Sequence, residues 1–260
     1  MEKLTVIKVG GKIVEQPDSL LTLLNAFKQI EGKKILVHGG GRSATALATQ
    51  MGVETTMIDG RRVTDSQMLR IVTMVYAGQV NKSIVATMQA LEMQALGMTG
   101  ADADIIRSHK RPPTPQADFG WVGDVDRISP EPLQILLKSG IIPVIAPLTH
   151  DGQGNMLNTN ADTMAQAVAT GLAPYFDVEL TYTFEKPGVM KTGKDLAEDV
   201  IPVITPQIFS ELTENGTITG GMIPKIENAL TALRQGVKLV TITQAENIHS
   251  PGSGTKITLE

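Results

Sequence analysis

The sequence predicts an α/β protein built on a parallel sheet that helices cover on both faces. Five short apolar runs recur along the chain, and segments with helical spacing of apolar residues separate most of them. The runs cover residues 4–9, 34–38, 141–146, 178–184 and 237–243. Because each run is continuously apolar, we expect buried strands of a parallel sheet. Ligands of such sheets bind beyond the carboxyl ends of the strands, so the residues that follow each run are the candidate site.

Composition restricts the class of protein and of partner. A chain of 260 residues with 42% hydrophobic and 19% charged residues is ordinary for a globular protein of one large domain or two lobes. A net charge of -4 without a Lys/Arg cluster argues against nucleic acid and for a small-molecule partner. Without cysteine there is no disulfide, thiolate zinc site or cysteine nucleophile. We expect a cytoplasmic protein with no membrane partner, since strand follows Met1 directly and no apolar run reaches about 18 residues.

The first strand contains a lysine and ends at paired glycines. Gly10 and Gly11 let the backbone turn sharply and approach a ligand closely. Burying the Lys8 ammonium group is costly unless an anion meets it. Lys8 therefore predicts a phosphate beside this turn, with a side chain that extends along the strand to water as the alternative.

Three glycines join the second strand to a helix predicted over residues 43–51. Gly39, Gly40 and Gly41 expose backbone N–H groups at a helix start, which is typical of phosphate or carboxylate sites. A tight structural turn is the alternative. His38 is the last residue of the second strand. It is either a catalytic base or, in the favoured interpretation, a hydrogen-bonded structural group.

An arginine pair precedes a helix predicted over residues 66–76. Thr64 or Asp65 is expected to cap this helix. Either Arg61 or Arg62 can bind a carboxylate through two N–H groups, and a solvated pair is the alternative.

The next predicted elements are a helix and a surface excursion. Helical spacing predicts a helix over residues 80–96. Residues 119–124 indicate a hairpin or flap, which is either a lid over a substrate or a plain excursion.

Asparagines and an aspartate surround the start of a helix predicted over residues 164–170. They are helix caps in one interpretation. In the other, Asp162 is an orienting carboxylate and Asn158 contacts the ligand.

A phosphate-loop signature occurs after the fourth strand, beyond Pro174, where a second lobe is expected to begin. Residues 188–194 spell G-x-x-x-x-G-K, but Asp195 stands where Ser or Thr would hold a metal. The following residues contain Pro202 instead of a long helix. This argues against a true phosphate loop and leaves a different nucleotide-contacting loop open.

A lysine lies in the first turn of the helix predicted over residues 223–234. Pro224 suits a first helical turn, and the preceding glycines expose neighbouring amides. A cation is unfavourable at this end of the helix dipole. Lys225 is therefore placed to meet an anion.

Five motifs in this order resemble the amino acid kinase family, most specifically its members that phosphorylate N-acetylglutamate. They are Lys8-Val-Gly-Gly11, His38-Gly-Gly-Gly41, Gly60-Arg-Arg-Val-Thr64, Asn158-Thr-Asn-Ala-Asp162 and Gly220-Gly-Met-Ile-Pro-Lys225. The resemblance extends from the first strand to the last. It implies a three-layer αβα sandwich around a mainly parallel sheet, with the acyl-amino-acid site in a lobe of residues 1–174 and the nucleotide on residues 175–260.

The resemblance also implies the reaction and the roles of residues. ATP, with Mg²⁺, phosphorylates the γ-carboxylate of N-acetylglutamate to an acyl phosphate, the second step of arginine biosynthesis. The implied catalytic residues are Lys8, Lys225 and Asp162, and no residue is assigned as a metal ligand. The implied substrate contacts are Gly40, Gly41, Arg62, Asn158 and Asn160. The implied nucleotide contacts are Gly10, Gly11, Glu185, Lys186, Gly188, Val189, Thr217, Ile218, Thr219, Gly220 and Gly221.

Two departures from the family's pattern limit these expectations. Phe184-Glu-Lys-Pro187 replaces the usual Thr-Asp-Val before the Gly-Val of the nucleotide loop. The chain also lacks the N-terminal helical extension of the arginine-inhibited hexameric members, so we expect a homodimer that is insensitive to arginine. The alternatives are the same reaction on N-succinylglutamate, and a non-catalytic sensor of nucleotide or amino acid.

Overall fold

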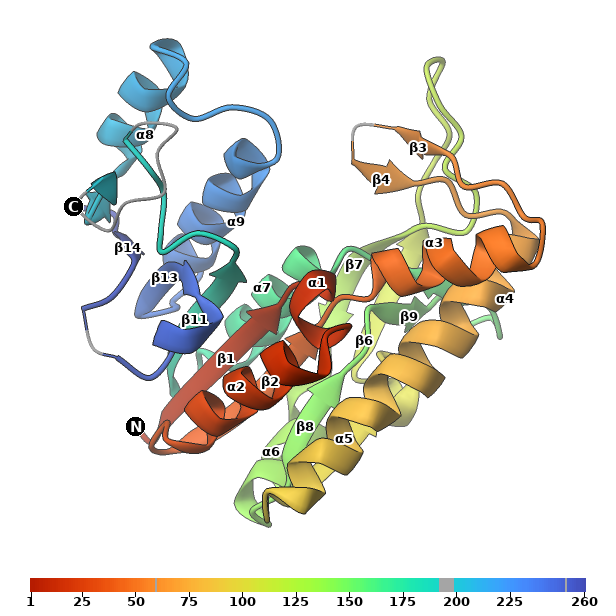
Figure 1. The fold of residues 1–260 in the computed structure, drawn as a ribbon, viewed down its shortest axis with the longest axis horizontal. Helices are drawn as coiled ribbons and strands as arrows, with labels where there is room; N and C mark the ends of the chain where they lie inside the picture. Colours follow the sequence, from red (N-terminus) through yellow and green to blue (C-terminus); the bar gives the residue numbers. More distant parts are fainter. Residues whose placement is uncertain (59, 192–198, 251) are drawn as a thin grey trace.

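The computed structural model in Figure 1 describes residues 1–58, 60–191, 199–250 and 252–260. An eight-stranded sheet crosses the molecule. Its strands in spatial order are β12 (Val203–Ile204), β14 (Thr255–Ile257), β13 (Leu239–Gln244), β11 (Asp177–Phe184), β1 (Lys3–Val9), β2 (Lys33–His38), β8 (Ile142–Ile145) and β5 (Ala95–Met98). All neighbours pair in parallel except β13 and β14. The five predicted runs are confirmed as strands, and they form the centre of this sheet.

Helices cover both faces of the sheet, as predicted (Figure 1). One face packs against α6 (Pro130–Lys138), α7 (Ala161–Leu172), α8 (Pro206–Glu214) and α9 (Met222–Arg234). The other packs against α1 (Gly11–Val14), α2 (Pro17–Lys28), α3 (Gly41–Gln50), α4 (Ser66–Thr73) and α5 (Asn81–Ala90). In β1, Leu4 and Val6 belong to the first core, and Ile7 and Val9 belong to the second. This alternation explains why the strand is apolar throughout.

The prediction of a helix over residues 80–96 is wrong beyond Ala90, where α5 ends. A π-helix, η1 (Met74–Val80), joins α4 to α5, and α5 ends at Ala90. Glu92 has a positive φ of 58°, and the backbone then enters β5, which pairs with β8. Sequence periodicity missed β5 because its four residues are stabilised by pairing with a strand more than forty residues away. At the other end of this helical segment, Asp65 caps α4 as predicted, accepting from Met68 N at 2.7 Å.

A smaller sheet lies beside the main one, near the carboxyl end of β8. Its order is β10 (Met156–Asn158), β9 (Leu148–His150), β6 (Ile106–Lys110) and β7 (Gly123–Ile128). Residues 119–124 are not a hairpin in themselves, because the hairpin consists of β6 and β7. A separate ribbon pairs β3 (Met57–Ile58) with β4 (Arg61–Arg62).

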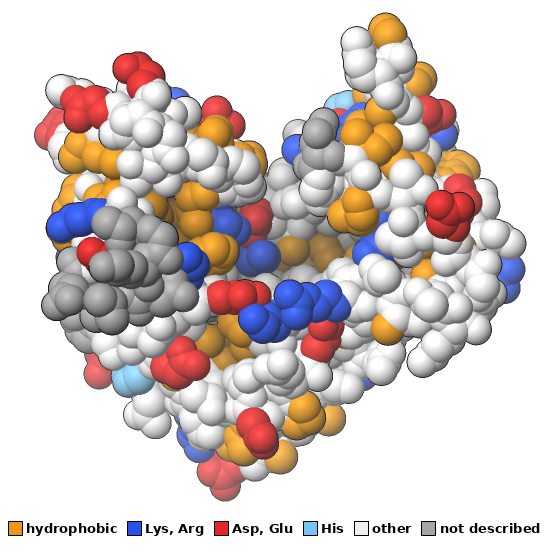
Figure 2. All heavy atoms as spheres, turned by 45° about the horizontal axis from the view of Figure 1, so that its top comes forward, with side chains coloured by type: hydrophobic (Ala, Val, Ile, Leu, Met, Phe, Trp, Pro, Cys, Tyr) orange, Lys and Arg blue, Asp and Glu red, His pale blue; other side chains and the backbone are white. Residues whose placement is uncertain are grey.

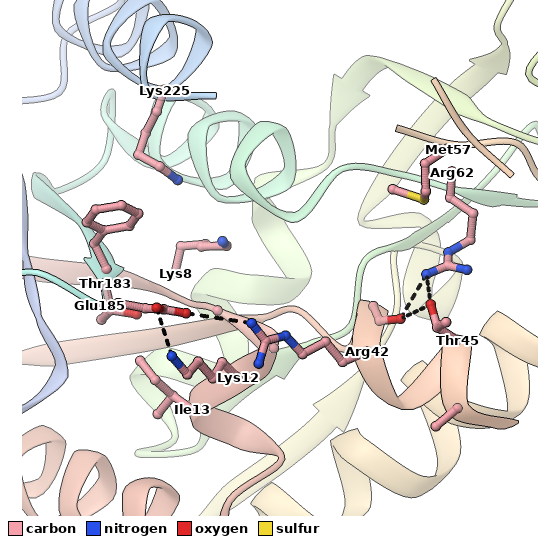
Figure 3. A pocket seen from close by; sticks show the side chains of 15 residues that line it. Lys8, Lys12, Ile13, Arg42, Thr45, Met57, Arg62, Thr183, Glu185 and Lys225 are labelled. Atoms are coloured by element: carbon pink, nitrogen blue, oxygen red, sulfur yellow. Dashed lines mark hydrogen bonds and ion pairs between the residues drawn. The ribbon is translucent and has the colours of Figure 1, made fainter. Parts of the chain in front are cut away.

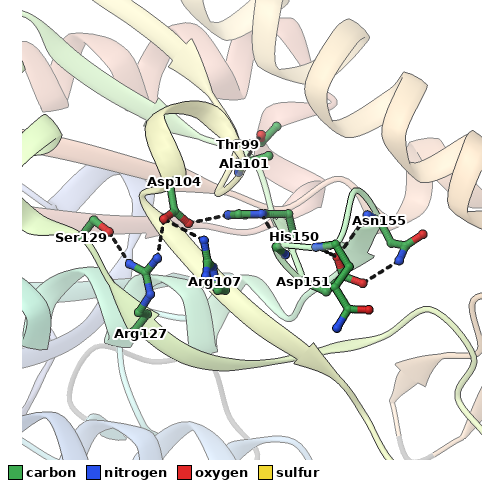
Figure 4. A network of polar contacts seen from close by, with 11 residues as sticks. Thr99, Ala101, Asp104, Arg107, Arg127, Ser129, His150, Asp151 and Asn155 are labelled. Carbon is green, nitrogen blue, oxygen red and sulfur yellow. Dashed lines mark hydrogen bonds and ion pairs between the residues drawn. The ribbon is translucent and has the colours of Figure 1, made fainter.

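A polar network fastens this smaller sheet (Figure 4). The Asp104 carboxylate accepts from Arg107 Nη2 at 3.1 Å, from His150 Nε2 at 2.7 Å and from Arg127. Ala103 and Asp104 both have φ of 53°, a left-handed conformation that is costly for residues with a side chain. The three hydrogen bonds hold the Asp104 side chain in place. None of these side chains lines the cavities described below, so we assign the network a structural role.

Within the described residues, no helix has the length and apolar character needed to cross a membrane.

Candidate active site

A cleft of about 730 Å³ opens at the carboxyl ends of the central strands, as the sheet topology predicts. Figure 2 shows a hollow between two raised parts of the surface, with basic side chains at its floor. The cleft is lined by Lys8, Gly10, Gly11, Lys12, Ile13, Gly41, Arg42, Thr45, Ala46, Met57, Arg62, Thr183, Phe184, Glu185 and Lys225. Residues from the first strand, both glycine turns and the last long helix therefore meet in one place.

An inner cluster of Lys8, Asp162 and Lys225 lies at the bottom of this cleft. Lys8 Nζ is 2.8 Å from Asp162 Oδ1, and Lys225 Nζ is 2.8 Å from Asp162 Oδ2. The three side chains are 12%, 19% and 10% exposed, in that order. Both lysines extend into the cleft (Figure 3). The sequence predicted a phosphate beside Lys8, and in the structure the Asp162 carboxylate lies against its ammonium group.

Burial and charge act in opposite directions on the inner cluster. Burial alone would raise the pKa of Asp162, but the charges of Lys8 and Lys225 and their hydrogen bonds lower it to about 2. Burial lowers the pKa of Lys225, while Asp162 opposes that shift. The Lys225 ammonium group also lies 5.4 Å from the ring centre of Tyr182. One carboxylate thus holds two cations, which leaves a net positive charge facing the cleft.

The two glycine turns pack directly against each other. A Cβ on Gly39 would lie 3.1 Å from Gly11 N, and one on Gly40 would lie 2.9 Å from Cδ1 of Tyr76. Tyr76 belongs to the π-helix η1, a rare element that is often found at functional sites. Gly40 is also the residue directly before α3. Because it has no Cβ, its backbone can lie this close to the Tyr76 ring. A larger residue at Gly39 would separate the turns, and one at Gly40 would displace the Tyr76 ring.

Arg62 lies between the cleft and a second, smaller cavity. Its Nη2 donates to Gly41 O at 2.8 Å and to Thr45 Oγ1 at 2.7 Å. The second cavity, of about 200 Å³, is lined by Gly39, Gly40, Gly41, Met57, Gly60, Arg61, Arg62, Tyr76, Val122, Pro147, Asn158, Thr159, Asn160 and Ala161. All five predicted substrate contacts line this cavity. Asp59, between the strands of the ribbon, lies outside the described residues.

The two asparagines have structural partners in addition to their place at the cavity. Asn158 Nδ2 donates to Thr64 Oγ1 at 2.9 Å. Asn160 Oδ1 caps α7 by accepting from the backbone N–H groups of Asp162 and Thr163. The capping interpretation is therefore correct for Asn160, and the cap fixes the backbone that presents Asp162.

His38 is a buried structural group. Its Nδ1 donates to Gly39 O at 2.8 Å, and its Nε2 accepts from Asn81 Nδ2 at 3.1 Å. Burial lowers the pKa of His38 to about 4, with the nearby Lys82 charge adding to the shift and the Gly39 hydrogen bond opposing it. The favoured interpretation of this residue is confirmed, because an imidazole with both ring nitrogens engaged and with so low a pKa accepts a proton poorly.

An outer cluster of Lys12, Glu185 and Arg42 lies at the mouth of the cleft (Figure 3). Lys12 Nζ is 2.8 Å from Glu185 Oε2, and Arg42 Nη2 is 3.8 Å from Glu185 Oε1. The hydrogen bond from Lys12 lowers the pKa of Glu185. Glu185 is among the predicted nucleotide contacts, whereas neither cation was predicted from the sequence. The available signal was their position, since each directly follows a glycine turn, at Gly11 and at Gly41.

Several predicted nucleotide contacts lie outside both cavities. They are Lys186, Gly188, Val189, Thr217, Ile218, Thr219, Gly220 and Gly221. Val189 is buried, and its N–H donates to Thr255 Oγ1 at 2.8 Å. Gly188 packs so closely that a Cβ would lie 2.6 Å from Val200. Residues 192–194 of the phosphate-loop signature, and Asp195 after it, lie outside the described residues.

The comparisons with known proteins agree with this geometry. The chain matches the model of the amino acid kinase family over residues 3–244. It belongs to the amino acid kinase family. This amino acid kinase is 56% identical over 256 residues to an acetylglutamate kinase from Phocaeicola vulgatus, covering 98% of each chain. It is also 56% identical over 257 residues to an acetylglutamate kinase from Parabacteroides distasonis, covering 99% of this chain and 100% of the relative.

A solved structure supports the fold. The carbamate kinase from Giardia lamblia bound to AMP-PNP superposes with a TM-score of 0.70 at 14% identity, covering 99% of this chain and 98% of that one. At this identity the likeness concerns the fold alone. The αβα sandwich around a mainly parallel sheet is thereby confirmed.

Proposed function

We propose that this amino acid kinase transfers the γ-phosphoryl group of ATP to the γ-carboxylate of N-acetyl-L-glutamate, giving N-acetylglutamyl 5-phosphate. The observation that carries the proposal is the inner cluster, in which Asp162 holds two ammonium groups at the floor of the cleft. It is supported by 56% identity to acetylglutamate kinases over nearly the whole chain. The reaction would be the second step of arginine biosynthesis, and we propose that it takes place in the cytoplasm.

The geometry suits phosphoryl transfer to a carboxylate. A carboxylate is already deprotonated at neutral pH, so its oxygen can attack the γ-phosphorus without a general base. As the new O–P bond forms, the bond to the β-phosphate oxygen breaks and ADP leaves. Lys8 and Lys225 would stabilise the charge on the transferring group, and Asp162 would position both. The engagement of both ring nitrogens of His38 in hydrogen bonds agrees with a mechanism that needs no base.

We propose that the two substrates divide the site between the predicted lobes. The smaller cavity is lined only by residues between 39 and 161, within the lobe of residues 1–174, which favours it for the acyl-glutamate. Gly40 and Gly41 would hold the reacting carboxylate, and Arg62 and Asn158 the α-carboxylate end. The nucleotide would lie across the larger cleft toward residues 175–260, with its base and ribose near residues 186–189 and 217–221.

Magnesium is best treated as part of the substrate MgATP. Among the described residues there is no group of three or more histidine or acidic side chains placed to hold a metal ion. The site contains two carboxylates, and both already have cationic partners. Asp162 pairs with Lys8 and Lys225. Glu185 pairs with Lys12. We therefore assign no protein ligand to the ion. It would neutralise phosphate charge within the bound nucleotide.

We further propose a homodimer. The main sheet ends at β5, and Leu96 of this strand is 44% exposed. Ile135 of α6 is 64% exposed and lines the same shallow hollow. An edge strand beside exposed aliphatic side chains favours pairing with a second copy. Light scattering should give the mass of a dimer, and millimolar arginine should leave the rate unchanged. A hexameric or monomeric mass would contradict the proposal.

The test of function is ADP release with MgATP and an acyl-glutamate. We expect turnover with N-acetylglutamate, and N-succinylglutamate assayed in parallel measures how the site selects the acyl group. A higher kcat/KM for the succinyl compound would change the proposed substrate but not the reaction. ATP binding without ADP release on either compound would overturn the proposed activity in favour of a sensor.

A further inference from the structure

We propose that Lys12 and Arg42 bind the polyphosphate of the nucleotide at the mouth of the cleft, and that the Glu185 carboxylate competes with the phosphates for them. The proposal rests on the proposed function, because it takes ATP as the nucleotide. It assigns two further binding residues to the site and a modulating role to a third.

The charge balance at the mouth supports anion binding. Lys12 and Arg42 share one carboxylate, so the outer cluster has a net charge of +1. The inner cluster has the same balance, with Lys8 and Lys225 sharing Asp162. Both clusters line or underlie one cleft, so their excess positive charge adds in the same space. A polyanion in this cleft would meet both.

Exposure makes the outer cluster exchangeable. The side chains of Lys12, Glu185 and Arg42 are 43%, 52% and 65% exposed. Ion pairs this accessible contribute little net stability, so a phosphate oxygen can replace the carboxylate at little cost. Arg42 lies 3.8 Å from Glu185 without a direct hydrogen bond, which leaves its guanidinium donors available to a ligand.

The positions of the two cations match the path of a polyphosphate. Lys12 follows the Gly10–Gly11 turn directly, and Arg42 follows Gly41 at the start of α3. Figure 3 shows Arg42 extending from α3 toward Glu185, with Lys8 between this outer cluster and Lys225. A phosphate chain whose terminal group lies at Lys8 and Lys225 would therefore extend outward past Lys12.

Two substitutions separate competition from a structural role of the ion pair. Lys12→Met removes a phosphate-binding cation but keeps the length of the side chain, and Glu185→Gln removes the competing charge but keeps its shape. Each substitution breaks the same Lys12–Glu185 pair. If the pair only stabilised the cleft, both would change nucleotide affinity in the same direction. Competition predicts opposite directions.

The chain offers a matched control pair. Lys3 Nζ lies 3.0 Å from Glu179 Oε2, with side chains 51% and 35% exposed. This pair links β1 to β11 near the beginnings of the two strands, whereas the cleft lies at their carboxyl ends. Lys3→Met and Glu179→Gln therefore remove the same kinds of charge from a pair that lies away from the cleft. We expect both control variants to keep wild-type nucleotide affinity.

The experiment measures binding of inorganic tripolyphosphate by calorimetry, and KM for MgATP. Lys12→Met should weaken tripolyphosphate binding and raise KM about five-fold, and Glu185→Gln should tighten binding about two- to three-fold. Shifts in the same direction, no shift in either variant, or equal shifts in the control pair would overturn the proposal. Because tripolyphosphate binding needs no turnover, it decides the proposal even if the chain phosphorylates no acyl-glutamate.

Discussion

The inner and outer clusters have the same composition of charge and differ in burial. In each, two cations flank one carboxylate, at Asp162 inside the cleft and at Glu185 at its mouth. The inner side chains are 10–19% exposed, whereas the outer ones are 43–65% exposed. Removing one partner of a buried pair leaves an uncompensated charge and costs about 3–5 kcal/mol, but an exposed pair contributes about 0–1 kcal/mol.

This difference suits the clusters to different tasks. Buried cations keep fixed positions and act through a medium less polar than water, as stabilisation of a transition state requires. Exposed cations exchange partners readily, as binding and release of a nucleotide require. The same three charges can therefore serve chemistry or binding according to how deeply the fold places them.

The largest predicted effect is the loss of an inner cation. Lys225→Met should lower kcat by about 10²–10³-fold with a smaller change in KM, because the ammonium group would act mainly on the transition state. The double variant with Lys8→Met should lose less than the product of the single losses, since both lysines share Asp162. Steady-state kinetics measures both effects. Lys238→Met, at an exposed site away from the cleft, should behave as wild type.

The second-largest effect concerns the contribution of the Asp162 carboxylate to the free energy of unfolding, which depends on pH. Its folded pKa of about 2 lies below the ordinary value of 3.8, so the unfolded chain binds its proton first as the pH falls. The resulting stabilisation is fully present above about pH 5 and is lost as the pH falls toward 2, and it amounts to roughly 2 kcal/mol.

The difference between wild type and Asp162→Asn isolates this contribution. Urea unfolding from pH 6 to pH 2 should show a destabilisation of the variant that shrinks as the pH falls. A difference in the free energy of unfolding that stays constant over this range would show that the ionised carboxylate is not what stabilises the site.

The smallest effect is the change in the free energy of unfolding when the outer cluster loses a cation. Lys12→Met should change the free energy of unfolding by less than about 1 kcal/mol, and 1 M NaCl should reduce even that difference. Urea unfolding at low and high salt measures it. A loss above about 2 kcal/mol would mean that the outer cluster supports the fold, in conflict with its exchangeable character.

Sequence reasoning predicted the elements whose signals are local and the residues that lie at strand ends. The five central strands are continuously apolar because both faces are buried. Lys8, Asp162 and Lys225 were predictable because the carboxyl edge of a parallel sheet brings strand ends and helix starts together. Their roles in catalysis remain a prediction that kinetics must test.

What the sequence did not reveal depends on contacts between distant segments. The edge strand β5 exists through its pairing with β8, which no local pattern of four residues encodes. In the outer cluster, Arg42 lies 143 positions before Glu185 in the sequence, and Lys12 lies 173 positions before it. Before the fold was known, each cation was indistinguishable from a solvated surface charge.

In the proposed mechanism the inner cluster serves phosphoryl transfer and the outer cluster serves nucleotide binding. The most direct test compares kcat for Lys8→Met and Lys12→Met at saturating MgATP and N-acetylglutamate. We predict a fall of about 10²–10³-fold for Lys8→Met and a kcat within about two-fold of wild type for Lys12→Met. Near-normal turnover by Lys8→Met, or an equal loss in both variants, would contradict the account.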